Sequence, residues 1–534
     1  MFKLSRLIRG CLLVTIMAVL LALFWDGSQR TDAAGRGTIS SGANHACALS
    51  DTGGLKCWGL NSFGELGVVG TLSTNVFTPS DVDGLATGVA VVDAGSNHTC
   101  AVTTSGGVKC WGQNVLGQVG AVTGDCLGGS LLCTNTPTDV VGLSSGYVSV
   151  TAGGDHSCAL SEAGGVKCWG RNRHGELGSV TMETCTDFLL AEVPCSTVPV
   201  DVTGLSSGVA QISAGGDHTC ARMNNGTVKC WGWNDKGQVG AGLLEVDNYV
   251  PIDIDDSDAY FDVSAGGDHT CGVTTAGAAK CWGRANSGQV GYGSAGSLVR
   301  FPIGVVGLSA GAVQVTAGSS HSCAVTSGGI KCWGGNSWGA IGDGTDENRL
   351  VPVDPVALNA NPLVVAAGGQ FTCAKYSDGG MQCWGLGGHG QLGTAAIPMC
   401  DTNQLCSLTP VKLAESWLQD TDADGDGCLN KVELSFDETR GGLRDPDNPW
   451  DFYDVAGSPL PPQNGAPDGV IDLPNDILGV IQHHPAGTLG YDVQFDRGPW
   501  TGPNSWNETQ GPDGVIDLPN DILGVILQFQ HSCQ

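Results

Sequence analysis

Apolar and polar side chains alternate around short glycine turns through most of this chain. Residues 99–104 alternate in this way, and the turn Ser105-Gly106-Gly107 follows them. Residues 108–111 then form a second short segment that runs back along the first. Period-two alternation around a glycine turn is typical of a β-hairpin. In the predicted hairpin Cys100 lies opposite Cys110, close enough for a disulfide bond.

The same unit occurs seven times, and every copy carries two cysteines, the second of which precedes Trp-Gly. Successive copies lie 50 to 62 residues apart, a period that points to a propeller or a repeat array. The sixth pair is one residue closer together and fits a two-residue turn. The predicted pairs are Cys47 with Cys57, Cys100 with Cys110, Cys158 with Cys168, Cys220 with Cys230, Cys271 with Cys281, Cys323 with Cys332 and Cys373 with Cys383.

Further extended segments accompany each hairpin. Residues 147–153 precede the third hairpin, and a Thr-Pro-x-x-Val-x-Gly-Leu segment, residues 136–143, leads into them. Three to four short strands in each of seven units predict an all-β fold, a seven-bladed β-propeller, over residues 35–414. The first unit starts at 37–39 without a Thr-Pro segment, whereas the seventh is followed by an extra one, 409–413. We therefore expect 409–413 to complete the first blade and close the ring.

Three short motifs recur beside the cysteine pairs. In the third copy they read Gly153-Gly154-Asp155-His156-Ser157, Trp169-Gly170-Arg171-Asn172 and Gly175-Glu176-Leu177-Gly178. These motifs resemble the regulator of chromosome condensation repeat family over residues 37–413, and the resemblance implies a seven-bladed β-propeller. It does not imply one function, because the fold hosts nucleotide exchange factors, photoreceptors and protein inhibitors. The founding family member is a nuclear exchange factor, from which this chain departs in charge, cysteine content and expected compartment.

The N-terminus has the layout of a secretory signal. Three basic residues precede an apolar run at 11–25, and the small residues Ala33-Ala34 follow a polar stretch. A core of this length is short for a membrane-spanning helix, so residues 1–34 are predicted to be a signal peptide. An uncleaved membrane anchor is the alternative, because no clean small-x-small cleavage site is visible.

Export permits disulfides, and the cysteines can then all be paired. The chain has 23 cysteines, of which Cys11 leaves with the signal. Three additional pairs lie in the longer connections, and the last two cysteines pair with each other. These four predicted pairs are Cys126 with Cys133, Cys185 with Cys195, Cys400 with Cys406 and Cys428 with Cys533.

Charge and composition narrow the classes of partner. The formal net charge is -29, and no basic stripe is present. Binding to nucleic acid depends on clustered Lys and Arg, so a nucleic-acid partner is not expected. The 84 glycines and the sparse charges suit short strands joined by tight turns. The predicted location is secreted, extracellular or at the cell surface.

Six repeats carry a histidine two residues before the first cysteine, and the seventh has Phe371 there. A ring of histidines could suggest metal or proton chemistry. One histidine in each blade would lie too far from the next to share an ion, and Phe371 shows that an apolar ring is tolerated. We therefore predict a packed imidazole bonded to the backbone. The six are His45, His98, His156, His218, His269 and His321.

Tryptophans divide into two groups. The seven that follow the second cysteines are predicted to be blade core, since they stand at a fixed place beside each disulfide. Trp233 and Trp338 fall instead in the loops after the Trp-Gly element and are the predicted binding residues. The disulfide-braced insertions 121–135 and 181–196 are the most individual loops, and we expect a protein partner to touch them.

The sequence contains no recognisable catalytic constellation. A nucleophile elbow, a His-Glu-x-x-His motif, a phosphate loop and paired carboxylates in a convincing setting are all missing from it. We therefore expect a protein that is not an enzyme.

The composition changes after Leu413, where an acidic tail begins. Residues 415–440 contain an EF-hand-like calcium loop with oxygen ligands at every informative position. Ligands at this density select a hard cation, here Ca²⁺, and a solvated acidic turn is the alternative. The predicted ligands are Asp422, Asp424, Asp426, the carbonyl of Cys428, Asn430 and Glu433.

A Pro-rich linker, 441–467, leads to a tail in which one segment occurs twice, at 467–481 and 512–526. Each copy places apolar residues on one face of a helix, so 468–534 is predicted to form a small helical pair. Its Asp-Gly-x-Ile-Asp pattern resembles the second half of a dockerin calcium loop. The first half departs from that pattern, with Ala466 at a ligand position of the first copy, so a structural or docking module is favoured over calcium binding here.

Three functions remain open. The first is a secreted, non-enzymatic binding or scaffold protein whose propeller loops recognise an unidentified protein and whose calcium-binding tail docks or anchors it, with cell-surface docking as one form. The second is an inhibitor or modulator of an extracellular enzyme. The third, guanine-nucleotide exchange, is disfavoured by the secretory signal.

Overall fold

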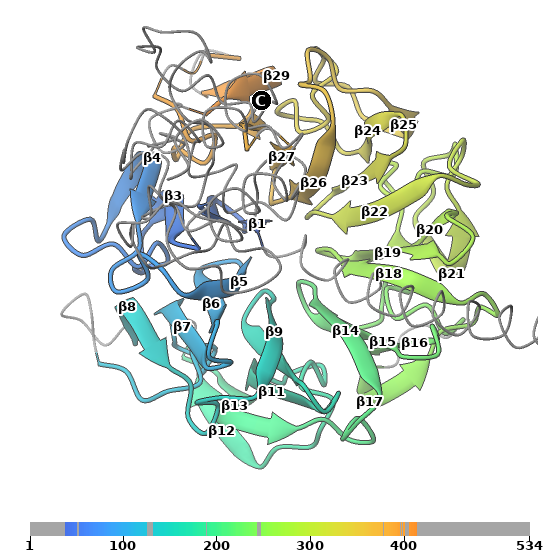
Figure 1. Cartoon of the computed structure of the whole chain (residues 1–534). Coiled ribbons are helices and arrows are strands. Elements are labelled where there is room, and N and C mark those ends of the chain that lie inside the picture. The colour runs from blue at the N-terminus through green and yellow to red at the C-terminus, as the bar shows by residue number, and fades with distance from the viewer. Residues whose placement is uncertain are drawn as a thin grey trace, which may run out of the picture. The chain divides into compact units, whose positions relative to one another are not determined.

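The structure, a computed structural model, describes residues 38–413 except for 51–52, 125–131, 188–189, 243–246, 378, 396, 398 and 401–404. Within these residues 29 strands form seven antiparallel sheets around one axis (Figure 1). The predicted all-β, seven-bladed propeller is confirmed. The part of the chain that the structure describes contains no helix long and apolar enough to span a bilayer. The predicted signal, calcium loop, linker and helical pair lie outside the described residues.

The blades follow one another in sequence order. The first contains β1 (Ile39–Ser41), β2 (His45–Leu49), β3 (Leu55–Asn61) and β4 (Thr74–Asp81). The second contains β5 (Val89–Ala94), β6 (His98–Thr103), β7 (Val108–Gln113) and β8 (Cys133–Asp139). The third, with an additional strand, contains β9 (Tyr147–Ala152), β10 (His156–Ser161), β11 (Val166–Arg171), β12 (Glu183–Thr186) and β13 (Glu192–Asp201).

The remaining four blades have four strands each. The fourth contains β14 (Val209–Ala214), β15 (His218–Met223), β16 (Val228–Gly232) and β17 (Asn248–Asp253). The fifth contains β18 (Tyr260–Ala265), β19 (His269–Thr274), β20 (Ala279–Arg284) and β21 (Leu298–Gly304). The sixth contains β22 (Ala312–Ala317), β23 (His321–Thr326), β24 (Gly329–Gly334) and β25 (Arg349–Val353). The seventh contains β26 (Pro362–Ala367), β27 (Phe371–Tyr376), β28 (Met381–Leu386) and β29 (Cys406–Lys412).

The central hairpin of each blade has the register that the alternation predicts. Cys100 stands directly opposite Cys110 on β6 and β7, and their Cα atoms are 4.1 Å apart. This separation is typical of a non-hydrogen-bonded antiparallel pair, in which side chains approach most closely. The shorter sixth hairpin turns between Thr326 and Gly329.

All seven predicted disulfides of the repeats are present in the structure. Each bond joins the two central strands of one blade, so it braces the hairpin from within. The bonds join Cys47 with Cys57, Cys100 with Cys110, Cys158 with Cys168, Cys220 with Cys230, Cys271 with Cys281, Cys323 with Cys332 and Cys373 with Cys383.

The expectation that 409–413 completes the first blade is wrong. β29 pairs with β28 of the seventh blade, and the first blade already has its own outer strand, β4. The Thr-Pro segment therefore belongs to the hairpin before it. Its place is marked by a cross-strand charge pair, since Lys56 stands opposite Asp81 with Nζ 2.5 Å from the carboxylate. Corresponding Lys–Asp pairs join the outer strands of blades two, three, four and six.

The ring closes instead through the backbone of the glycine turns before each hairpin. The N–H after the turn glycine donates to the glycine carbonyl of the next blade, as Ser96 does to Gly153 at 3.1 Å. A Cβ on Gly95 would lie 2.5 Å from that carbonyl oxygen, so the close approach requires glycine. The seven N–H to carbonyl pairs are Ala43 to Gly95, Ser96 to Gly153, Gly154 to Gly215, Gly216 to Gly266, Gly267 to Gly318, Ser319 to Gly368 and Gly369 to Gly42.

A second layer of contacts between blades centres on one carbonyl in each Gly-Gln/Glu-Leu/Val-Gly loop, which reads Gly-Ala-Ile-Gly in the sixth blade. The carbonyl of Glu65 in the first blade accepts the indole N–H of Trp111 at 2.9 Å and the hydroxyl of Thr99 at 2.7 Å, both from the second blade. All seven core tryptophans are fully buried, as predicted, and each makes the same indole bond to the preceding blade. Every indole N–H thus finds an acceptor despite its burial.

The repeated histidines belong to the same layer. Nε2 of His45 lies 2.9 Å from the hydroxyl of Thr99 in the next blade, and that hydroxyl is already committed as a donor to the Glu65 carbonyl. The imidazole must therefore donate from Nε2–H. The prediction of a packed structural imidazole is right, but its partner is a side chain of the neighbouring blade rather than backbone. Burial lowers the pKa of His45 to about 3 and that of His98 to about 4, so both are neutral at pH 7.

The seam between the seventh and first blades is built differently. Phe371 replaces the histidine, and Ala46 replaces the Ser/Thr that the histidine would contact. Both side chains are fully buried in one apolar cluster with Ile39, Val364 and Met381. Replacing both partners of a buried hydrogen bond by apolar groups avoids the cost of an unsatisfied one. The indole bond survives here, from Trp58 to the Gln391 carbonyl at 3.0 Å.

The closing seam provides a template for a double-mutant test at the pair His321–Thr372. Thr372→Ala alone should lower the free energy of unfolding by about 1 to 3 kcal/mol, because it strips His321 Nε2–H of its acceptor. The double variant His321→Phe/Thr372→Ala, which copies Phe371 and Ala46, should lose clearly less than the sum of the two single variants. Denaturant unfolding of all four proteins measures the coupling, and additive losses would contradict this account.

Candidate recognition face

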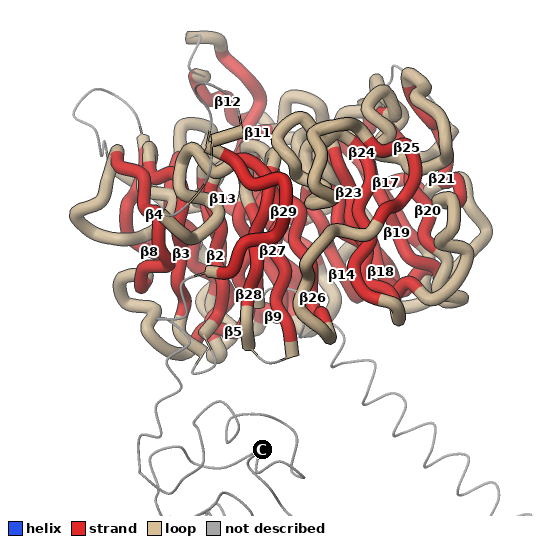
Figure 2. The backbone as a smooth tube through the Cα atoms, turned by 90° about the horizontal axis from the view of Figure 1, so that it is seen from above, coloured by secondary structure: helices blue, strands red, loops and turns tan. Residues whose placement is uncertain are grey.

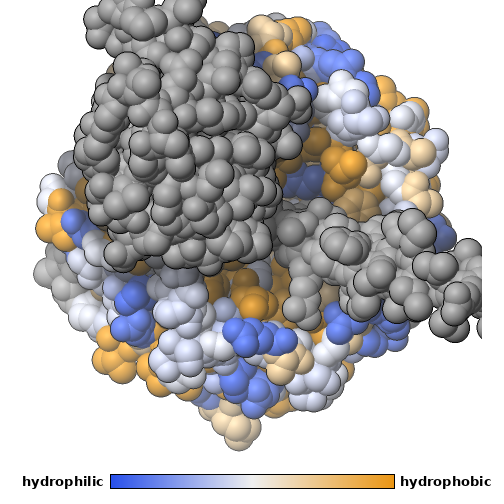
Figure 3. Space-filling view, viewed as in Figure 1, coloured by the Kyte–Doolittle hydropathy of each residue, from blue (hydrophilic) through white to orange (hydrophobic). Residues whose placement is uncertain are grey.

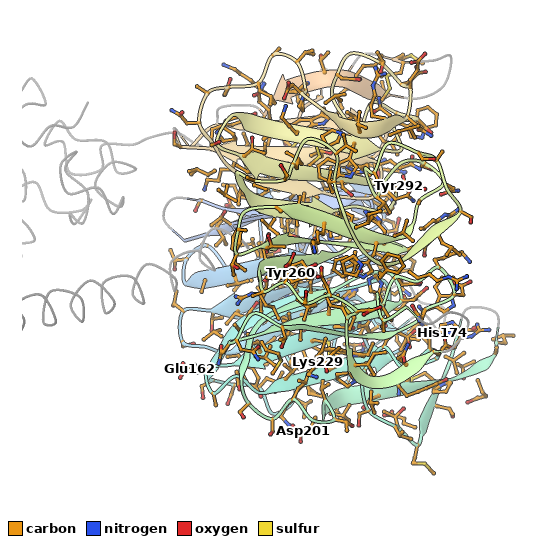
Figure 4. All side chains as sticks on the ribbon, turned by 90° about the vertical axis from the view of Figure 1, so that its right-hand side faces the viewer. Glu162, His174, Asp201, Lys229, Tyr260 and Tyr292 are labelled. Atoms are coloured by element: carbon orange, nitrogen blue, oxygen red, sulfur yellow. A yellow bond between two sulfur atoms is a disulfide. The ribbon has the colours of Figure 1, made fainter. Side chains whose placement is uncertain are left out.

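The loops that follow each Trp-Gly element lie on one face of the propeller and are held by their own side chains. In the third blade Oδ1 of Asn172 accepts the N–H of Leu177 at 3.1 Å, and Glu176 accepts the N–H of His174 at 2.7 Å. The equivalent Asn and Gln bonds recur in other blades. These loops are therefore rigid mounts for the residues at their tips. Figure 4 shows His174 on this face and Glu162, in a hairpin turn, on the opposite one.

An aromatic and cationic cluster occupies this face across the third and fourth blades. The rings of His174 and Trp233 stack with centroids 5.3 Å apart, and Nζ of Lys236 lies 5.4 Å from the centre of the Trp233 ring. Nδ1 of His174 is 2.9 Å from a carboxylate oxygen of Asp247. The cluster combines aromatic rings with a cation and a carboxylate, and aromatic side chains are enriched at the recognition surfaces of proteins.

The neighbouring outer strand completes the cluster. Tyr249 of β17 donates its hydroxyl to the carbonyl of Arg173 at 3.1 Å, and it is 43% exposed. Its backbone packs against Gly175, where a Cβ would come within 2.6 Å of Tyr249 Cα. The third and fourth blades therefore meet tightly here, and the aromatic side chains stand on a fixed base.

Beneath the cluster, one arginine ties the two blades together. The guanidinium of Arg171 pairs with Glu176 at 2.9 Å, with Asp155 at 3.4 Å and with Asp217 of the fourth blade. Burial raises the pKa of Asp155, and the adjacent Arg171 charge opposes that rise. The network neutralises carboxylates that would otherwise repel one another under the cluster.

The two predicted binding residues lie apart. Trp233 is half-buried within the cluster, whereas Trp338 of the sixth blade lines a small cavity with Ser320 and Gln370. Sequence reasoning did not find His174, Lys236 or Asp247, because the residues at these loop positions vary between blades and the repeat pattern does not mark them. The signal that could have found them is departure from the repeat at loop tips.

The structure describes more of the insertion in the third blade than of the insertion in the second blade. In the third blade β12 pairs with the first half of β13, and the predicted disulfide between Cys185 and Cys195 joins the two strands. Cys133 is disulfide-bonded, and its predicted partner Cys126 lies outside the described residues. The predicted bond between Cys400 and Cys406 is present. The last predicted pair, Cys428 with Cys533, lies outside the described residues.

One group of metal-capable side chains comes together among the described residues. Glu183, Cys185 and Cys195 place ligand atoms within 4.8 Å of one another. The two sulfurs are bonded to each other, and a metal requires free thiolates, so this group is not a metal site. The predicted calcium ligands, Asp422, Asp424, Asp426, Cys428, Asn430 and Glu433, lie outside the described residues.

Two of the loops after Trp-Gly carry a buried glutamate, Glu65 and Glu176, and the two glutamates differ in their charge environment. Glu65 is fully buried, and one of its oxygens accepts the N–H of Phe63 at 2.6 Å, but no cation in the described part of the chain pairs with it as Arg171 pairs with Glu176. Burial raises the pKa of Glu65 from 4.5 to about 7. Gln118 makes the same backbone contact in the second blade without a charge.

This difference predicts a pH-dependent effect of Glu65→Gln on stability. In the wild type the folded state holds its proton between pH 4.5 and 7 while the unfolded state loses it, so stability falls as pH rises through this window. The variant should equal the wild type near pH 4 and exceed it by about 3 kcal/mol above pH 7. Denaturant unfolding across this range checks the profile, and Glu176→Gln is the matched control that should not stabilise. Parallel profiles would contradict the prediction.

Comparison with known proteins finds seven repeats, one in each blade of the propeller. The regulator of chromosome condensation (RCC1) repeat matches residues 38–65, 89–118, 147–176, 209–238, 262–289, 312–339 and 364–391. A second description of this repeat matches 53–102, 163–222, 225–273, 280–325 and 327–374. Every match of the first set begins within or just before an inner strand and ends in the loop after Trp-Gly.

Whole proteins with similar sequences have varied functions. The ultraviolet-B receptor UVR8 of Arabidopsis thaliana is 31% identical over 337 residues, which cover 61% of this chain and 70% of the receptor. A secretion-regulating guanine nucleotide exchange factor of Bos taurus is 29% identical over 336 residues, covering 59% of this chain and 69% of that protein.

Solved structures of other proteins have a fold similar to that of this chain. Prp20p from Saccharomyces cerevisiae has a TM-score of 0.53 at 26% identity, covering 62% of this chain and 80% of that one. Human WBSCR16 has a TM-score of 0.54 at 23% identity, covering 62% and 84% of the two chains. With seven matched repeats, a 31% identical relative and a propeller of seven blades, this chain belongs to the RCC1 repeat family.

Proposed function

We propose that this protein is a secreted, non-enzymatic binding protein that uses loops of its propeller to recognise another protein. The observation that carries the proposal is the cluster of His174, Trp233 and Lys236, held on rigid loops at one face. Aromatic side chains and a cation on a preorganised base supply binding energy at low entropic cost. Solved structures of relatives support the proposal, since Prp20p from Saccharomyces cerevisiae binds Gsp1p and histones, and yeast RCC1 forms a complex with Kap60.

The disulfides support an extracellular location. Nine bonds link cysteines among the described residues, seven of them inside the blade cores. Bonds of this density form and persist in oxidising compartments and are rare in the cytosol. The predicted signal at 1–34 agrees with export, and an uncleaved anchor would leave the propeller tethered to a membrane.

Capture from culture medium tests the binding function. Immobilised protein should retain a defined partner, and Trp233→Ala should reduce the amount retained about tenfold or more, as truncation of a central aromatic does. Tyr147→Ala, a half-buried aromatic at the start of β9 on the opposite face, is the matched control and should retain the partner. Equal retention by Trp233→Ala would remove this cluster from the function, and capture of a small GTPase would favour nucleotide exchange instead.

Calcium binding by the tail is a separate part of the proposal. Asp422→Asn/Glu433→Gln removes two predicted ligands, so the number of calcium ions bound by the full chain should fall by one, because the loop needs its first and last carboxylates. Isothermal titration measures this stoichiometry. A wild-type chain that binds no calcium would overturn the assignment, and more than one ion would point to the repeats at 467–481 and 512–526.

A further inference from the structure

The hairpin inserted in the third blade projects from the ring on the same side as the recognition face (Figure 2). β12 adds a fifth strand to a sheet that has four in every other blade, and among the described strands it pairs with β13 alone. We call residues 180–187 and 190–196 the finger. It is the part of the described structure that departs most from the repeat, so its role is not that of a blade.

The base of the finger is firmly attached. Cys185, Cys195 and Val193 form a buried cluster with Leu116, which comes from the loop of the second blade. The N–H of Asn172 donates to the Pro194 carbonyl at 2.8 Å. A disulfide, an apolar contact to the neighbouring blade and a backbone bond together fix the direction in which the finger points.

Hydrogen bonds also fix its flank and its tip. Both carboxylate oxygens of Glu183 accept from Thr197, one from the N–H at 2.9 Å and the other from the hydroxyl at 2.6 Å. At the tip the N–H of Asp187 donates to the Ala191 carbonyl at 2.9 Å, and the Asp187 side chain accepts the N–H of Ala191 at 2.9 Å. The described part of the finger is therefore ordered before any partner arrives.

This ordered element presents apolar side chains to solvent. Val180 is 75% exposed, Met182 96% and Leu190 85%. Leu190 also has a φ of 60°, in the left-handed region that a bulky residue rarely adopts. A chain that holds a leucine in a strained conformation and exposes it gains nothing in its own stability, which points to a function at this position.

The charges on the finger are of one sign. No Lys or Arg occurs between residues 174 and 221, whereas Glu183, Asp187 and Glu192 lie on the finger. A partner with acidic groups at its surface would be repelled. A complementary partner has an apolar cleft to receive Leu190 and Met182 and basic side chains at its rim.

We propose that the finger is the anchor of the protein–protein contact, and that it inserts Leu190 and Met182 into an apolar cleft bordered by Lys and Arg on the partner. The inference rests on the proposed binding function and names the chemistry of the partner. Rigidity of the finger keeps the entropic cost of docking low.

Photo-crosslinking in the full chain tests the proposal. A benzophenone amino acid replaces Leu190 in one protein and Val148 in another, where Val148 is a 48% exposed residue of β9 at the opposite face. Figure 3 shows that this opposite face also carries apolar residues near its centre. Both replaced residues are exposed and apolar. The adduct from position 190 should join a secreted or cell-surface protein at an apolar cleft flanked by Lys or Arg.

Affinity measurements on the captured partner complete the test. Leu190→Asn, which tolerates the left-handed backbone, and Met182→Gln, which keeps the length of the side chain, should each weaken binding about tenfold or more, and added salt should weaken it further. Val148→Thr should leave binding unchanged. Circular dichroism confirms that the variants keep their fold.

The remaining outcomes overturn the proposal in distinguishable ways. An adduct only to a second copy of this chain, or only to lipid, would replace the partner cleft with self-association or membrane contact. Binding that survives Leu190→Asn and Met182→Gln but is lost in Trp233→Ala would remove the finger and keep the proposed function. Failure of the wild-type chain to retain any protein would remove both.

Discussion

Cohesion between the blades depends on one carbonyl in the loop after each Trp-Gly element, which in most blades reads Gly-Gln/Glu-Leu/Val-Gly. This carbonyl accepts the indole of the next blade and, in six of the seven seams, a hydroxyl that in turn accepts from an imidazole. These groups are almost completely excluded from water, where an unmade hydrogen bond costs more than a made one contributes. A blade is too small to bury its own tryptophan, so each repeat is complete only beside its neighbour.

The seventh seam shows that the polar and apolar solutions are interchangeable as pairs. Phe371 and Ala46 fill the space of an imidazole and a hydroxyl without leaving a donor unmatched. Loss of the hydroxyl alone would leave the buried imidazole N–H without an acceptor, whereas the change on both blades leaves neither group unmatched. Together with the backbone bond from Gly369 to Gly42, this apolar seam closes the ring without exchanging a strand between its ends.

Disulfide bonds and non-covalent contacts stabilise different parts of this propeller. Each disulfide described lies within one blade, where it links adjacent strands or braces an insertion, whereas the blades are joined to each other by hydrogen bonds and packing. The result is a rigid ring on which loops can vary without disturbing the core. His174, Trp233 and the finger all occupy such variable positions, and rigid frames of this kind carry recognition on their loops.

Local pattern was enough to predict the hairpins, their cysteine pairs and the burial of the core tryptophans. Alternation, turn residues and spacing act over about ten residues, and antiparallel register translates them directly into contacts such as Cys100 with Cys110. Seven repeats then required a closed ring. These features follow from short-range geometry, which the order of residues specifies.

Contacts between blades could not be predicted from the local sequence pattern. The sequence pattern did not determine which hairpin receives the Thr-Pro strand, and the expectation that 409–413 completes the first blade was wrong, because β29 pairs with β28 of the seventh blade. It also left open that His45 would meet Thr99 and that His174 would stack on Trp233, since these partners are 54 and 59 residues apart. Such pairs depend on how the blades are oriented around the axis, and that orientation arises only when all seven pack together.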